Sequence, residues 1–156
     1  MGELCEEDAT DQYADNWASC RGARVLVVDD DADMRALLAA RLDAVGCVAY
    51  AAASGSAALS VLTSKDFAKG VDLLLIDLRM PGTSGIEILT LLRAARQLPP
   101  AILMTAFAEP HVRTEALALG IHILEKPFTF DTLRRVAAAL ILSKRVEALR
   151  ESRVIR

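Results

Sequence analysis

The sequence predicts an α/β fold in which one parallel β-sheet is covered by helices on both faces. Short apolar runs alternate five times with stretches of helical periodicity between residues 23 and 142. The most apolar of these runs, residues 71–76, suits the centre of a sheet that is buried on both sides. Short crossovers favour the strand order 2-1-3-4-5. This arrangement is a doubly wound, flavodoxin-like (βα)5 fold.

The first two β/α units begin at Arg24. A strand over residues 24–28 precedes a helix whose apolar side chains recur at helical spacing and which Gly46 closes. A second strand over residues 47–52 leads to Ser54, which opens the next helix.

The third unit follows the central strand. Ser84 and, three residues later, Glu87 form a capping-box pattern, so a helix is expected to start there. Pro99 and Pro100 are expected to end that helix and to lead into the fourth strand.

The helix boundaries of the last two units are also marked by particular residues. Pro110 suits the first turn of a fourth helix, and Gly120 ends it. A fifth strand over residues 121–125 is followed by Thr129 as the N-cap of a final helix. Because no glycine or proline follows residue 130, this helix is expected to continue beyond the sheet.

Length and charge divide the chain of 156 residues into three parts. Hydrophobic residues make up 53% of it, enough for one core, which we place at residues 23–142. Residues 1–22 carry six acids and one arginine and predict a flexible leader, with a short docking helix through Tyr13 and Trp17 as the alternative. Residues 143–156 form a charged helical extension, either a frayed helix end or a coiled-coil stub that pairs two copies in a homodimer.

Other function classes find little support in composition. The three cysteines and two histidines lack the spacing of a zinc site. No signal peptide and no apolar run long enough to cross a bilayer is visible, so we expect a cytoplasmic protein without membrane contact. The near-neutral central part gives no reason to expect direct nucleic-acid binding.

Polar residues follow the apolar runs at four points and should meet at one edge of the sheet. Asp29 and Asp30 follow the first strand, Asp77 the third, Thr105 the fourth and Lys126 the fifth. Ligands of open α/β sheets bind outside the carboxyl ends of the strands. Three carboxylates suit Mg²⁺, and a hydroxyl and an ammonium suit a phosphoryl group. Each residue also has an ordinary structural interpretation, such as a helix N-cap for the Asp29–Asp30 pair.

Asp77 is the candidate nucleophile. It follows a run of apolar residues and precedes a forced turn at Met80-Pro81-Gly82. A carboxylate exposed beside a metal ion can attack phosphorus and form an acyl phosphate, while the cation and Lys126 neutralise the phosphoryl oxygens.

At these residues the chain resembles the receiver domain of bacterial two-component response regulators. The segments that carry the resemblance are residues 27–31, 76–82, 104–106 and 125–128. The resemblance implies that Asp77 accepts a phosphoryl group from a histidine kinase or phosphotransfer protein. It also implies a Mg²⁺ site formed by Asp29, Asp30, Asp77 and the backbone carbonyl of Arg79.

The resemblance assigns roles to the other residues as well. Lys126 would bind the phosphoryl group, and its peptide bond to Pro127 would be cis. Thr105 would move toward the phosphorylated aspartate and report its state to a downstream protein target. Ile123 departs from the family, in which an aromatic residue commonly stands three positions before the lysine.

Two rival functions remain open. A Mg²⁺-dependent phosphohydrolase with Asp77 as nucleophile would need an acid or base two residues later, where Arg79 stands. An interaction module that never carries phosphate would be expected to lack the aspartate or the lysine, whereas Asp77 and Lys126 are both present. The leading interpretation is therefore a switch rather than an enzyme that turns over an external substrate. The chain is either a stand-alone receiver or the receiver of a longer regulator.

Overall fold

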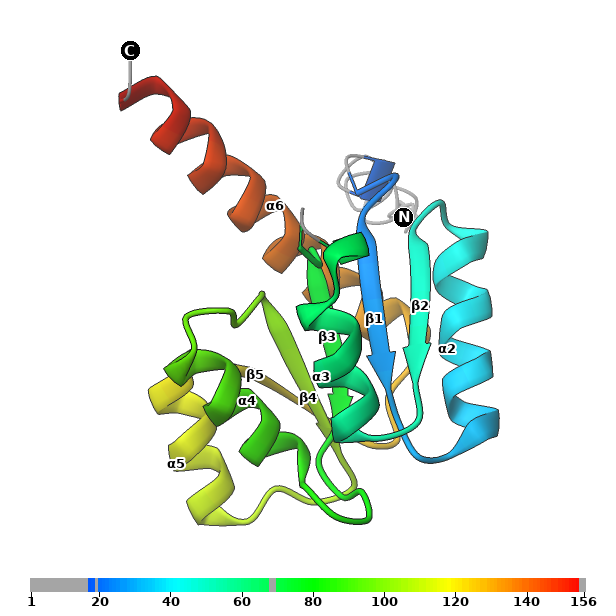
Figure 1. Ribbon diagram of the computed structural model, residues 1–156. Coiled ribbons are helices and arrows are strands. Elements are labelled where there is room, and N and C mark those ends of the chain that lie inside the picture. The colour runs from blue at the N-terminus through cyan, green and yellow to red at the C-terminus, as the bar shows by residue number, and fades with distance from the viewer. Residues whose placement is uncertain (1–16, 19, 68–69, 155–156) are drawn as a thin grey trace, which may run out of the picture.

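Five parallel strands form a single sheet in the order β2-β1-β3-β4-β5 in the computed structural model, which describes residues 17–18, 20–67 and 70–154 (Figure 1). The strands are β1 (Arg24–Val28), β2 (Val48–Ala52), β3 (Leu73–Asp77), β4 (Ala101–Thr105) and β5 (His122–Glu125). The helices are α2 (Ala32–Ala44), α3 (Gly55–Thr63), α4 (Gly85–Ala94), α5 (Pro110–Leu119) and α6 (Phe130–Val154), with a short 3-10 turn η1 (Lys65–Phe67). This architecture confirms the predicted doubly wound (βα)5 fold.

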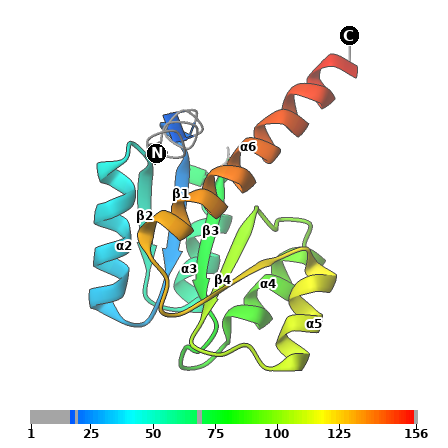
Figure 2. The same ribbon diagram turned by 180° about the vertical axis from the view of Figure 1, so that it is seen from behind.

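The two faces of the sheet bury alternate residues of the same strands. Leu26, Leu74 and Leu103 face the layer of α3, α4 and α5. Leu73 and Leu75, by contrast, face the layer of α2 and α6. Figure 2 shows α2 and α6 together on their side of the sheet. Because both faces are covered, β3 and β4 are buried along their whole length, as the apolar runs predicted.

The predicted helix starts agree with the observed caps. The capping box of Ser84 and Glu87 is present, and the Ser54 hydroxyl accepts the N–H of Ala57. Thr129 caps α6, since its hydroxyl accepts the N–H of Thr132 at 3.1 Å. Gly120 ends α5 in the left-handed conformation.

One predicted helix boundary is wrong. α4 ends at Ala94 rather than at the Pro99-Pro100 pair, because Arg96 takes up a left-handed backbone conformation with φ 56° and turns the chain first. The central strand also begins two residues later than predicted, at Leu73, because the Asp72 side chain bonds to the neighbouring strand. Its carboxylate accepts the N–H of Arg24 at 2.8 Å and so ties the start of β3 to the start of β1.

The leader expected over residues 1–22 does not extend to its predicted end. Trp17 is 5% exposed and Cys20 is fully buried, in one cluster with side chains of α2 and α6. The Trp17 indole N–H donates to the carbonyl of Val45 at 3.0 Å, so the ring is held at the end of α2. Burial of an indole and its hydrogen bond together outweigh the acidic, polar character of the segment. Tyr13 and the other residues before Trp17 lie outside the described residues.

The final helix continues past the sheet, as predicted. α6 runs without interruption to Val154, and its second half projects away from the body of the molecule (Figure 1). In the described part of the chain, no helix is both long enough and apolar enough to cross a membrane. The coiled-coil pairing of this extension stays a prediction.

Candidate functional site

Three carboxylates meet where β1 and β3 end. Val28 lies beside Ile76 in the parallel register, so Asp29, Asp30 and Asp77 leave the sheet at the same edge. One carboxylate oxygen of each lies within 4.8 Å of the others. Asp29 and Asp77 are buried, and Asp30 is exposed. The predicted acidic cluster is therefore present, with one open side.

Asp29 is the most confined of the three. Its Oδ1 accepts the N–H of Asp31 at 2.9 Å, whereas its buried Oδ2 has no hydrogen-bond partner among the described residues. The Lys126 ammonium lies 3.5 Å from this Oδ2 as an ion pair. The alternative N-cap role belongs to Asp31, whose carboxylate accepts the N–H groups of Asp33 and Met34. Asp29 is thus left with an oxygen directed into the cluster.

Asp77 and Lys126 form the centre of the site. The register of β3, β4 and β5 places the end of each strand beside the next, and the Lys126 Nζ donates to the Asp77 Oδ1 at 3.1 Å. The Lys126–Pro127 peptide bond is cis, as predicted. The Asp77 carboxylate and the Lys126 ammonium are therefore in direct contact, although β4 lies between β3 and β5 in the sheet.

The charges of this centre are unevenly balanced. Burial raises the pKa of the Asp77 carboxyl, and the negative charges of Asp29 and Asp30 raise it further against the opposing effect of Lys126. Burial alone would lower the pKa of the Lys126 ammonium, but its carboxylate partners Asp77 and Asp29 outweigh that effect, and the pKa lies above its ordinary value. The Lys126 ammonium thus lies among three carboxylates, so negative charge exceeds positive charge in this cluster.

This donor set fits a divalent cation. The orphaned Asp29 Oδ2, the raised pKa of Asp77 and the exposed Asp30 all describe carboxylate oxygens that a cation would satisfy. Oxygen donors with one side open to water are what Mg²⁺ uses in proteins.

Thr105 ends β4 beside this centre and is 1% exposed. Its carbonyl accepts the N–H of Lys126 at 2.7 Å, which fixes the two residues together. Its hydroxyl donates to the carbonyl of Phe107 at 2.9 Å and accepts the N–H of the same residue at 3.2 Å. In this state the hydroxyl is held by the loop that follows β4.

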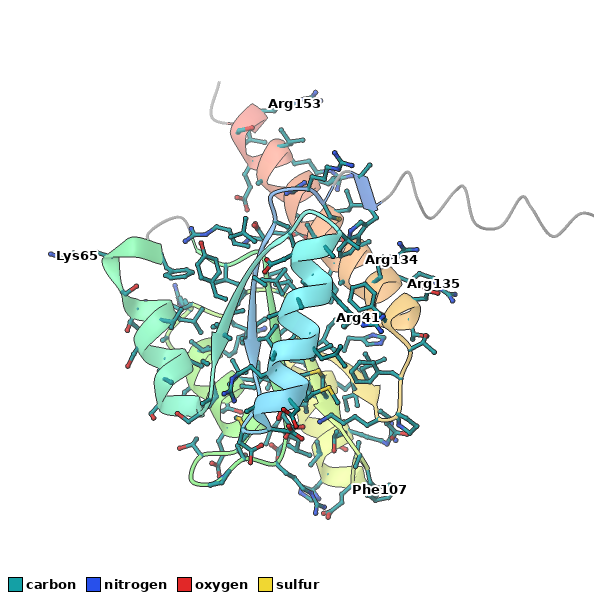
Figure 3. The ribbon with its side chains drawn as sticks, turned by 90° about the vertical axis from the view of Figure 1, so that its right-hand side faces the viewer. Arg41, Lys65, Phe107, Arg134, Arg135 and Arg153 are labelled. Carbon is teal, nitrogen blue, oxygen red and sulfur yellow. The ribbon has the colours of Figure 1, made fainter. Side chains whose placement is uncertain are left out.

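The Arg79 side chain points away from the carboxylates. It is 74% exposed and forms an ion pair with Glu109 at 3.6 Å, which joins the loops after β3 and β4. Beside this pair lies a groove of about 690 Å³, whose lining includes Phe107 and His111. Phe107 is 60% exposed at the edge of the molecule (Figure 3). The role of the Arg79 carbonyl as a metal ligand stays a prediction.

Two residues that support the site were absent from the sequence-based prediction. Gly85 lies so close to β3 that a Cβ there would stand 2.3 Å from the Asp77 carbonyl oxygen. Arg35 on α2 donates to the Asp29 carbonyl at 2.7 Å. A glycine directly after the Ser84 cap was a visible signal for Gly85, but nothing in the sequence pointed from Arg35 to Asp29.

Ile123 is half-buried on β5 and packs against the cluster formed with α3, α4 and α5. The aliphatic side chain therefore fills the inward position at which the family commonly has an aromatic residue.

The sequence matches a known protein family. The response regulator receiver domain matches residues 25–138. Among curated proteins, the chain is 34% identical over 112 residues to sporulation initiation phosphotransferase F of Bacillus subtilis, covering 71% of this chain and 87% of that protein. It is 34% identical over 114 residues to regulatory protein AtoC of Escherichia coli, covering 72% of this chain but only 24% of the relative.

Solved structures of response regulators resemble this chain as well. The Francisella response regulator 1452 receiver domain is 27% identical with a TM-score of 0.69, covering 78% of this chain and 98% of that structure. Response regulator TrrA from Thermotoga maritima, in complex with Mg²⁺-BeF, is 33% identical with a TM-score of 0.63, covering 76% and 98% respectively. The chain thus spans nearly all of these two solved structures, and about a quarter of AtoC.

Proposed function

This chain belongs to the response regulator receiver family, and we propose that it is a phosphorylation switch whose phosphoacceptor is Asp77. Receiver domains are signalling switches of two-component systems. The observation that carries the assignment of Asp77 is its contact with Lys126 inside a cluster of three carboxylates. We expect the switch to act in the cytoplasm and not to turn over an external substrate.

The proposed reaction is a phosphoryl transfer from a histidine kinase or phosphotransfer protein. A carboxylate oxygen of Asp77 attacks phosphorus, the bond from phosphorus to the donor imidazole breaks, and an acyl phosphate forms. Lys126 is positioned to pair with a phosphoryl oxygen in place of the Asp77 oxygen that it now contacts. The charge that develops on the phosphoryl group would thus be met by an ammonium already in place.

We propose that Mg²⁺ is held by Asp29, Asp30, Asp77 and the backbone carbonyl of Arg79. The unsatisfied Asp29 Oδ2 supports this assignment, and the related TrrA was solved with Mg²⁺-BeF. Bound there, the cation would neutralise negative charge on the carboxylates and on the phosphoryl oxygens. Asp29 is held in position for this by the N–H of Asp31 and by Arg35.

The output of the switch is proposed to begin at Thr105. Its hydroxyl now bonds both polar backbone groups of Phe107, so turning it toward a phosphorylated Asp77 would release the loop before α5. Ile123 packs against the same layer of helices. It has no hydroxyl group, so it cannot respond by changing a hydrogen bond. The change would therefore pass through packing at α5 and β5 to a downstream protein target.

The proposal is tested by incubating the chain with Mg²⁺ and acetyl phosphate and measuring intact mass. The wild type should gain one phosphoryl group, and Asp77→Asn should gain none. Asp33→Asn, which removes an exposed carboxylate close to the site, is the matched control and should behave as the wild type. Absence of the gain in the wild type, or its persistence in Asp77→Asn, would contradict the assignment.

A further inference from the structure

The projecting part of α6 has two chemically different sides. Val146, Leu149, Arg150 and Arg153 are exposed and fall within about 100° of arc on a helix of 3.6 residues per turn. We call these four residues the basic-apolar face. The acids of this segment lie outside this arc, with Glu147 about 60° and Glu151 about 100° from Arg150 around the helix. The described ion pairs of α6 involve Arg134 and Lys144 but no residue of the basic-apolar face.

The described N-terminal part of the chain packs against the first half of α6, before the basic-apolar face begins. Cys20 is buried against α6, with its Sγ 4.0 Å from the carbonyl of Ala138. Leu149 lies eleven positions beyond Ala138, close to three helical turns, and therefore on the same side of the helix about 16 Å further along. Trp17 holds the chain at this point through its hydrogen bond to Val45. The segment before Trp17 thus starts at the end of α2, in the hydrophobic cluster that also contains Ala138 and Ile141 of α6.

That segment is complementary in charge and long enough to reach. Residues 1–16 contain six acids and no lysine or arginine, with Leu4 and Tyr13 as apolar residues among them. Sixteen residues of random coil would have an end-to-end distance of about 20–24 Å, and α6 rises about 24 Å from Ala138 to Val154. Tethering raises the effective concentration of such a segment to roughly millimolar. Attraction between opposite charges acts at this range when salt is low.

We propose that residues 1–16 dock, within the same chain, on the basic-apolar face of α6. Acidic side chains of the segment pair with Arg150 and Arg153, and its apolar residues cover Val146 and Leu149. Glu147 and Glu151, which lie outside this arc, repel the segment from the rest of the helix surface.

The test uses a nitroxide spin label on Cys5 and the amide signals of α6. Cys5 is the cysteine of the segment, whereas Cys20 and Cys47 are buried, and burial raises the pKa of the Cys47 thiol to about 11. In the full chain at low salt, the label should reduce the amide signals of residues 146–153 at least about twofold, and high salt should restore them. A labelled Cys5→Ser sample gives the background from the two buried thiols.

Matched variants separate this contact from a general charge effect. Arg150→Gln with Arg153→Gln removes two charges from the face and keeps the helix-forming character of both positions. Lys65→Gln with Arg96→Gln removes the same charge from exposed positions elsewhere, and Figure 3 shows Lys65 far from Arg153. The first pair should abolish the signal loss, and the second should leave it unchanged.

A mixed sample identifies the occupant of the face. Spin-labelled chain without isotope is combined with ¹⁵N-labelled Cys5→Ser chain, so that only contacts between copies reduce the signals. The proposal requires no loss in this mixture. Loss in the mixture would assign the face to a second copy and overturn the proposal. Equal signals with and without the label in the single-species experiment would overturn it as well.

Discussion

Charged side chains are paired differently at the two ends of the strands, which we call the carboxyl edge and the amino edge of the sheet. At the carboxyl edge, Asp29 and Asp77 are buried with a single ammonium between them, and one carboxylate oxygen lacks a hydrogen bond. At the amino edge, Asp72 accepts a backbone N–H and pairs with Lys144, whose ammonium also donates to the carbonyl of Val71. The carboxyl edge thus leaves a carboxylate oxygen without a hydrogen bond, whereas the amino edge satisfies its carboxylate within the fold.

Apolar packing follows the same division. Trp17 and Cys20 close the amino edge between α2 and α6, where they are almost completely buried. The carboxyl edge is open on the side of Asp30, and Phe107 stands exposed beside it. Substitutions at the amino edge should therefore change the free energy of unfolding and leave the chemistry at Asp77 intact.

Trp17→Ala should have the largest effect. Loss of a buried indole and of its hydrogen bond to Val45 should lower the free energy of unfolding by about 3 kcal/mol. Urea denaturation measures this change, and Trp17→Phe, which retains most of the packing, should lose less. Acetyl phosphate should still modify Asp77 in folded Trp17→Ala. An unchanged denaturation midpoint would mean that the amino edge is stable without this ring.

Magnesium should act on the opposite edge with a slightly smaller effect. At a concentration of about 100 times its Kd, Mg²⁺ should raise the free energy of unfolding by about 2.7 kcal/mol, because it binds the folded chain alone. Asp30→Asn should weaken this stabilisation, and Asp33→Asn, with the same change in charge, should retain it. Thermal unfolding with and without the ion measures both. Equal responses of the two variants would remove Asp30 from the site.

Asp77→Asn should give the smallest effect, visible only without divalent cations. Because the pKa of Asp77 is raised on folding, the folded wild type binds more protons than the unfolded chain above the ordinary value of 3.8. Its free energy of unfolding therefore falls, relative to the variant, as the pH rises from 3.8 through the folded pKa. At neutral pH the variant should therefore be more stable than the wild type.

The pH dependence has a defined direction. The advantage of Asp77→Asn should disappear as the pH falls toward 3.8 and should be constant above the folded pKa. Addition of Mg²⁺ should reverse the order of stability at neutral pH. A variant that is less stable than the wild type without cations would show that the Lys126 contact outweighs the burial of Asp77.

Hydrophobic periodicity and the residues typical of caps and turns predicted the helices and strands well, because these features depend on residues close in sequence. The caps at Ser54, Ser84 and Thr129 and the end of α5 at Gly120 are local hydrogen bonds or local backbone preferences. The end of α4 was missed because Arg96 adopts a left-handed backbone conformation and ends the helix before the prolines. Arginine is not a residue type that predicts this conformation.

The candidate site was predictable as a set of residues but not as a balance of charges. The strand ends named Asp29, Asp30, Asp77, Thr105 and Lys126, since parallel strands must deliver their carboxyl ends to one edge. The hydroxyl of Thr105, bound to Phe107, and the support of Gly85 behind Asp77 depend on how loops fold back. Such contacts are set by the whole fold and leave little trace in the sequence.

The sequence by itself determined the strand order, the helix caps and the residues of the acidic site, because hydrophobic period, turn chemistry and strand-end positions are written along the chain. Only the tertiary structure decided that Trp17 and Cys20 belong to the core and that Asp29 keeps an unsatisfied oxygen. Burial and pairing are properties of neighbours in space, and residues as far apart as Cys20 and Ala138 become neighbours only when the chain has folded.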